Sequence, residues 1–322
     1  MSAILTADEI RKLHDEGQRV LCFSEPPVLT DLAKELLSRL DMRISVDSGT
    51  ESSAAAESPA PCPAGGKMKM KRLLASGRKI CGTFIATPHP AVCESVGRLG
   101  FDFLLIDSEH SAMSLETVLT MLQATDLTPA CSSVRVPTIA YEYVAGILDA
   151  GAEALLIPQV RSVEDVARIR DYSLYPPVGK RGIGPGRASS YGAAIMEKAK
   201  GDPNADTCIM LQIETSEALE NLEPISEFNF VDLLFVGPGD LSMNLGIFGQ
   251  FDHPFLKEAI DRVLAVCRKR GKKSGIFAGN MKAAEKWLNY GFDMVVVNSD
   301  VGLLAEAVTT GLAGLRSALR QS

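Results

Sequence analysis

The sequence predicts a (β/α)8 TIM barrel preceded by a small N-terminal appendage, and three observations support this fold class. The chain has 322 residues, of which 46% are hydrophobic and 23% charged, as in ordinary globular proteins. From residue 67 onward, short apolar runs alternate with helix-like segments. Eight such units fit into roughly 250 residues, which is the size of a TIM barrel. An open doubly wound sheet is the alternative, but no GxGxxG follows the first run.

The first 66 residues are predicted to form two short segments of their own. Residues 1–48 predict a small α/β appendage, in which Thr6 and Glu9 form a capping box for a helix ending near residue 17. A strand over 19–23 and a second helix over 32–40 follow. Residues 49–66 are rich in Ser, Ala, Pro and Gly and predict a flexible linker, which leaves 67–322 for the barrel. The appendage is expected to dock a protein partner or to pack on the main domain.

The barrel strands are predicted from apolar runs bounded by turn residues. They cover residues 80–86, 103–106, 133–136, 154–157, 208–213, 233–236, 274–277 and 294–297. Helical patterns lie between them, for example one opened by Ser162 and one over 255–267. The segment from Tyr175 to Gly192 predicts a long loop, and long loops of barrels are commonly functional.

Composition limits the partners and the compartment. The formal net charge of -7 argues against a nucleic acid or an anionic membrane as a partner, because both attract basic surfaces. No run of about 18 apolar residues is present, and the N-terminus lacks the pattern of a signal peptide. The seven cysteines are scattered without a CxxC pair, as in a reducing compartment. We therefore expect a cytoplasmic protein whose partners are small molecules or other proteins.

The second predicted strand ends in an unusual cluster of polar residues. Asp107, Glu109 and His110 directly follow it. His110 is a candidate general acid or base, because its unperturbed pKa lies near working pH. The alternative is that His110 caps the following helix.

Other strand ends supply two carboxylates and an arginine. Glu214 and Asp240 follow adjacent strands and could hold a hard divalent cation such as Mg or Mn. Alternatively, they cap helices or pair with arginine. Arg135 needs an anionic partner if buried, and that partner is either a substrate oxygen or a neighbouring carboxylate.

Two further features bear on the chemistry. No lysine lies at the C-terminal end of a predicted strand, which favours metal chemistry over a Schiff base. Residues 182–186 (GIGPG), followed by Arg187, could cradle an anion or form only a flexible turn.

Motifs along the barrel segment match one known family. They are, in order, 105–110 (LIDSEH), 134–135 (VR), 148–152 (LDAGA), 175–177 (YPP) with 181–182 (RG), 187–188 (RA), 212–214 (QIE), and 237–242 (GPGDLS) with 245–246 (LG). From about residue 67 to its end, the chain resembles the HpcH/HpaI metal-dependent aldolases, a group of TIM barrels related to citrate lyase. Ser108 stands where many relatives carry Gly, and Gly239 where Ala is frequent.

The resemblance implies roles for individual residues. Glu214 and Asp240 are expected to hold a divalent metal ion (Mg, Mn or Co), and His110 is expected to be the catalytic acid/base. Arg135 is expected to stabilise the keto or enolate oxygen of the substrate. Asp149 is expected to position the histidine, across a subunit interface.

The remaining expectations concern the substrate and the assembly. Gln212 and the backbone amides around Gly239 are expected to bind the 2-oxo acid. The implied reaction is reversible cleavage of a 4-hydroxy-2-oxo acid to pyruvate, or a related 2-oxo acid, and an aldehyde. Decarboxylation of oxaloacetate through the same enolate is one alternative, and a non-catalytic scaffold barrel is another. The resemblance also implies a homo-oligomer, for example a hexamer.

Overall fold

The computed structural model describes residues 4–8, 10–11, 20–23, 28–40, 43–46, 68–198 and 200–321. The chain divides into two compact units, residues 1–58 and 59–322. The predicted linker over 49–66 lies outside the described residues, so the predicted domain limits stay predictions.

In its described residues, the first unit contains short strands and the helix α2. Its strands β1 and β3 pair in parallel, as do β2 and β4. Helix α2 matches the predicted second helix and buries Ala33 and Leu37 against Ile10. The predicted helix after Thr6 is described only at residues 7–8 and 10–11, which are helical. The bounds are β1 Ile4–Leu5, β2 Val20–Phe23, β3 Val28–Leu29, α2 Asp31–Arg39 and β4 Arg43–Val46.

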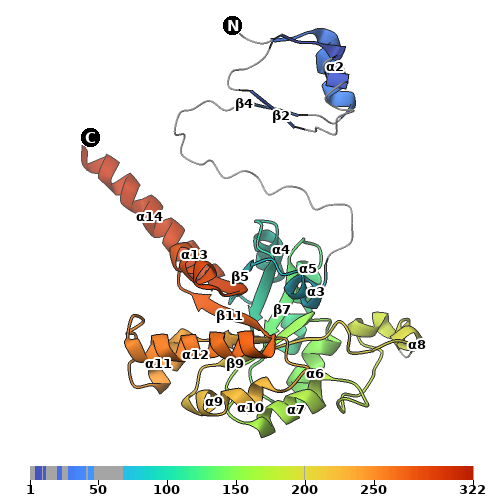
Figure 1. Cartoon of the computed structure of the whole chain (residues 1–322), viewed down its shortest axis with the longest axis vertical. Coiled ribbons are helices and arrows are strands. Elements are labelled where there is room, and N and C mark those ends of the chain that lie inside the picture. Colours follow the sequence, from blue (N-terminus) through green and yellow to red (C-terminus); the bar gives the residue numbers. More distant parts are fainter. Residues whose placement is uncertain are drawn as a thin grey trace. The chain divides into compact units, whose positions relative to one another are not determined.

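The second unit is a closed barrel of eight parallel strands, as predicted (Figure 1). The strands follow one another around the barrel in chain order from β5 to β12, and β12 closes on β5. Their bounds are β5 Ile80–Ile85, β6 Phe103–Asp107, β7 Cys131–Arg135, β8 Ala154–Ile157, β9 Cys208–Ile213, β10 Leu233–Val236, β11 Lys273–Ala278 and β12 Met294–Ser299. Each predicted run therefore became a strand, with ends shifted by at most two residues.

Helices follow the strands in chain order. They are α4 Pro90–Gly97, α5 Leu115–Thr125, α6 Tyr141–Asp149, α7 Val163–Ser173, α9 Ser216–Glu220, α10 Leu222–Ser226, α11 Pro238–Asn244, α12 Pro254–Arg270, α13 Met281–Tyr290 and α14 Asp300–Gln321. The predicted long loop between β8 and β9 includes a short 3₁₀ helix, η1 Arg187–Gly192, and is followed by α8 Ile195–Lys198. Within the described residues, no helix is long and apolar enough to cross a membrane.

Two apolar clusters build the barrel. Residues pointing inward, such as Phe103 and Phe235, fill the interior. Helix α3 (Met70–Ala75) contributes Met70 and Leu73 to the same cluster, which places this helix under the N-terminal ends of the strands. A larger cluster lies between the strands and the surrounding helices. This packing leaves the C-terminal strand ends free to carry polar groups.

Candidate active site

The segment after β6 forms a tight turn at the C-terminal mouth of the barrel. Asp107 ends the strand, and its Oδ1 accepts hydrogen bonds from the backbone N–H of Glu109 at 3.1 Å and of His110 at 3.3 Å. Such a local carboxylate-to-backbone turn is typical of aspartate. It fixes where the next two side chains leave the backbone.

Arg135 ends β7, and its guanidinium is held on several sides. Its Nε and Nη2 donate to the two oxygens of Asp107 at 2.9 and 2.7 Å, and its Nη1 lies 3.2 Å from Glu109 Oε2. The guanidinium carbon lies 4.5 Å from the centre of the Phe84 ring. Of the two predicted partners, the structure therefore supplies neighbouring carboxylates. The bidentate pair and the ring fix the plane of the guanidinium.

His110 lies at the edge of the mouth. Its side chain is 62% exposed, and its Nε2 lies 3.7 Å from Glu109 Oε2. The N-cap of the next helix is Ser114, whose hydroxyl accepts from the backbone N–H of Thr117. His110 therefore does not cap this helix, and the alternative interpretation of this histidine is wrong.

Glu214 lies just past the end of β9 and is almost fully buried. Its Oε1 accepts from the backbone N–H of Gln159 at 2.8 Å and from the Gln159 side-chain amide at 3.0 Å. Its Oε2 accepts from the side-chain amide of Gln212. Burial raises the pKa of Glu214 to about 7; the hydrogen bonds oppose this shift, and the nearby charges of Glu109 and Asp240 add to it.

Asp240 enters the same mouth from α11, where it lies in the first turn. Gly237 lets that turn approach β9 closely, because a Cβ atom there would lie 3.1 Å from Glu214 Oε2. By contrast, a Cβ at Gly239 would meet no atom within 4 Å. The start of α11 therefore has open space beside Gly239, where backbone N–H groups of a first helical turn can face a ligand.

Comparison with protein families identifies the family of the barrel. The family model described as HpcH/HpaI aldolase/citrate lyase matches residues 81–307. The chain belongs to this family. It is similar to a 4-hydroxy-2-oxovalerate aldolase of Novosphingobium aromaticivorans, with 35% identity over 75% of this chain and 92% of the relative. It is also similar to a 4-hydroxy-2-oxo-heptane-1,7-dioate aldolase of Escherichia coli, with 35% identity over 74% of this chain and 90% of the relative.

A solved structure supports the same assignment. The barrel superposes on an HpcH/HpaI aldolase/citrate lyase family protein from Burkholderia cenocepacia with a TM-score of 0.73 and 30% identity. The match covers 77% of this chain and 98% of the other. The (β/α)8 fold and the family predicted from the sequence are thus confirmed.

HpcH/HpaI aldolases generally depend on a divalent metal, and the mouth has the chemistry to hold one. Glu214 and Asp240 supply hard carboxylate oxygens, and the buried Oε1 of Gln212 accepts no hydrogen bond from the described residues. The negative charges of Glu109 and Asp240 raise the pKa of Glu214, and the charge of Asp240 raises that of Glu109, which a cation would relieve. In the part of the chain that the structure describes, no three His, Cys, Asp or Glu side chains converge on one point. A bound ion would therefore take its other ligands from water or substrate.

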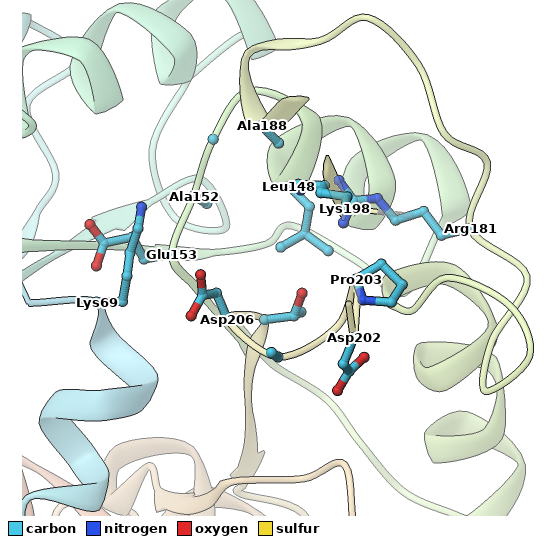
Figure 2. A pocket seen from close by; sticks show the side chains of 13 residues that line it. Lys69, Leu148, Ala152, Glu153, Arg181, Ala188, Lys198, Asp202, Pro203 and Asp206 are labelled. Carbon is cyan, nitrogen blue, oxygen red and sulfur yellow. The ribbon is translucent and has the colours of Figure 1, made fainter. Parts of the chain in front are cut away.

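Asp149 lies elsewhere in this chain. It ends α6, and the helices of a (β/α)8 barrel run opposite to its strands, so Asp149 lies near the end away from His110. Its Oδ1 accepts from Arg181 Nη2 at 2.5 Å, and Arg181 stacks on the ring of Tyr175. The guanidinium lies beside Lys198 on the wall of a cavity of about 250 Å³ (Figure 2). A role for Asp149 beside His110 thus requires a second subunit and stays a prediction.

The glycine-rich segment after Arg181 supports the turn interpretation. The Ser189 hydroxyl donates to the carbonyl oxygens of Gly184 and Gly186 at 2.8 and 2.9 Å, which closes the loop on itself. Arg187 pairs with Asp126. Its charge is therefore already compensated.

Sequence reasoning missed two residues of the mouth. Gln159, two residues after β8, holds Glu214 with two hydrogen bonds and has a φ of 54°. Phe84, near the end of β5, lies under Arg135. Both positions follow from the rule that C-terminal strand ends face the mouth, which would have pointed to them.

Proposed function

We propose that this chain is a metal-dependent carbon–carbon lyase that reversibly cleaves a 4-hydroxy-2-oxo acid to pyruvate, or a related 2-oxo acid, and an aldehyde. The observation that carries the proposal is that Arg135, Glu214 and Asp240 lie at the C-terminal strand ends of one barrel, in a chain that is 35% identical to such aldolases. The relatives are covered over nine-tenths of their length.

Each residue of the mouth has its own part in the proposed reaction. His110 takes the proton of the 4-hydroxyl, whose O–H electrons form the aldehyde carbonyl as the C3–C4 bond breaks. The electron pair of that bond forms the C2–C3 double bond of an enolate, and Arg135 offsets the negative charge on its C2 oxygen. The proton held by His110 then passes to C3, directly or through water, which gives the 2-oxo acid and restores the neutral histidine. Gln212 and the backbone at Gly239 hold the 2-oxo acid. A divalent metal held by Glu214 and Asp240 would supply Lewis-acid polarisation of the keto oxygen.

Four finer points are part of the same proposal. The ion is Mg, Mn or Co, because carboxylate and water ligands accept each of them. The enzyme acts as a homo-oligomer, in which Asp149 of one copy orients His110 of another. The N-terminal unit docks a protein partner. The compartment is the cytoplasm, in keeping with seven scattered cysteines.

The test is pyruvate release by the purified full chain. The substrates are 4-hydroxy-2-oxo acids with short and carboxylated tails, together with oxaloacetate, each with chelator and with added Mg, Mn or Co. We expect turnover that chelator abolishes, and we expect His110→Asn and Glu214→Gln to lower kcat at least about 100-fold. Glu142→Gln, an exposed residue in the first turn of α6, is the matched control. No pyruvate from any 4-hydroxy-2-oxo acid with any of the metals would contradict the proposal.

A further inference from the structure

Glu109 lies between the two groups that the proposed reaction needs most. Its Oε2 is 3.2 Å from Arg135 Nη1 and 3.7 Å from His110 Nε2. The side chain of Glu109 is 13% exposed, whereas that of His110 is 62% exposed. Glu109 Oε2 is itself buried and accepts no aligned hydrogen bond from the described residues. One inward carboxylate oxygen thus faces both the arginine and the histidine.

The contacts of Arg135 show what Glu109 adds to them. Asp107 already takes Nε and Nη2, so Glu109 faces the one guanidinium nitrogen that Asp107 leaves. With Phe84 beneath the guanidinium, the group is held in plane and in rotation. Within the described residues, Glu109 is also the one carboxylate within 4 Å of the His110 imidazole. Replacement of Glu109 would remove this contact from the exposed His110 ring and from one side of the Arg135 guanidinium.

The location of Glu109 is costly for a carboxylate. Burial raises the pKa of Glu109 to about 7; Arg135 opposes this shift, and the charges of Asp107 and Asp240 add to it. His110 and Glu214 are the other titratable groups near it. A residue kept only for stability has little reason to carry an ionisable group here, since natural active sites retain such groups for their chemistry.

We propose that Glu109 is a positioning residue that orients His110 and Arg135 together at the mouth. The inference rests on the proposed function, because the proton transfer and the enolate belong to that reaction. A neutral amide of the same size at this position would keep the packing and remove the negative charge that faces both the Arg135 guanidinium and the His110 imidazole.

The kinetic test compares Glu109→Gln and Glu109→Asp with wild type and with Glu116→Gln, an exposed acid in the first turn of α5. We expect Glu109→Gln to lower kcat about 10- to 100-fold, as removal of orienting partners typically does, with KM changed less than about threefold. Glu109→Asp keeps the charge on a shorter arm and should recover part of the loss. Glu116→Gln should equal wild type.

A second measurement follows thermal unfolding between pH 5 and 8 in the presence of chelator. Because the pKa of Glu109 is about 7 in the folded chain and its ordinary value is 4.5, the folded state binds the proton more tightly than the unfolded state. This residue's contribution to stability therefore falls as pH rises from about 4.5 to about 7. Glu109→Gln lacks this loss, so above pH 7 its Tm should equal or exceed that of wild type. An ion pair kept for stability would give the opposite sign.

Each outcome decides the matter. Low kcat with an undiminished Tm at pH 8, and partial recovery in Glu109→Asp, supports the positioning role. A Glu109→Gln variant within about twofold of wild-type kcat overturns it. A Glu109→Gln variant with a lower kcat and also a lower Tm than wild type overturns the positioning role as well. A wild type that releases no pyruvate overturns the proposed function, and the inference with it.

Discussion

Arg135 owes its orientation to strand pairing. The register of β6 and β7 places Asp107 directly opposite Arg135, although the two residues are 28 positions apart in sequence. Neighbouring residues in parallel strands lie close enough for the side chains to meet at the strand ends. The bidentate contact follows from this register, and the guanidinium then presents its remaining edge to Glu109 and the mouth.

Replacement of Arg135 by lysine tests whether this fixed geometry matters. A lysine keeps the positive charge, but it is a point charge that cannot hold both Asp107 oxygens and face Glu109 in one plane. We expect Arg135→Lys to lower kcat about 100-fold, the typical effect of removing one donor from an oxyanion site. Steady-state pyruvate release measures this change.

The control for that variant is Arg168→Lys. Arg168 is half exposed and pairs with Asp165 on α7, so its replacement should leave kcat unchanged. Equal kcat for Arg135→Lys and wild type would show that charge alone suffices at position 135.

The sequence was sufficient to predict most of the residues at the barrel mouth, but not the contacts between them. Glu214, Asp240 and His110 were predicted because each follows an apolar run. Whether Arg135 meets a substrate or a carboxylate could not be told, because the answer depends on strand register. Gln159 escaped notice because its role rests on a left-handed backbone conformation that a glutamine rarely adopts.

Among the elements, helix α7 shows how local sequence sets a boundary. Ser162 accepts a hydrogen bond from the backbone N–H of Asp165, and the Asp165 carboxylate accepts from the backbone N–H of Ser162. This capping box satisfies two otherwise free donors at the start of the helix. It was visible in the sequence, as were the eight apolar strands, because each depends on residues within one segment.

Removal of the cap gives a prediction at this scale. Ser162→Ala should lower the free energy of unfolding by about 1 kcal/mol, and Tm by a few degrees, because the Asp165 N–H loses its acceptor. Thermal unfolding followed by circular dichroism measures the effect. Ser95→Ala, an exposed position inside α4, is the control and should not lower Tm. If both variants have the same Tm as wild type, the cap contributes nothing measurable to stability.

The element that local sequence explains least is α14. It follows β12 and should cover the barrel as the eighth helix. It is anchored at its start, where the Asp300 carboxylate accepts hydrogen bonds from the backbone N–H groups of Ala86 and Thr87. It then runs away from the strands (Figure 1).

For the whole molecule, the exposed face of α14 bears on the assembly of the protein. Six large apolar side chains at helical spacing are 44 to 66% exposed: Val301, Leu304, Val308, Leu312, Leu315 and Leu319. The neighbouring helices α13 and α4 bury only one and two described residues, whereas α12 buries seven. An apolar stripe of this length on a globular protein indicates an interface.

The occupant we expect for this face is a second copy of the chain. A buried aliphatic side chain contributes at least about 1.5 kcal/mol at about 25 cal/mol per Å², which corresponds to about 60 Å², so six of them give about 360 Å² per helix. Two helices, each covered by an equal area of the other copy, would bury about 1,400 Å² in total, which is within the range of a standard stable interface. This area is sufficient to support the homo-oligomer proposed above.

Two charged residues in the stripe should therefore separate the subunits. In the double variant Leu304→Glu with Leu315→Glu, each new carboxylate would have to be buried without a partner, which is strongly unfavourable. We expect wild type to be an oligomer by light scattering after gel filtration and the variant to have a smaller mass. Thr310→Glu, an exposed residue on the opposite side of α14, should keep the wild-type mass. If the double variant also keeps that mass, or if wild type is a monomer, α14 is not the contact between copies.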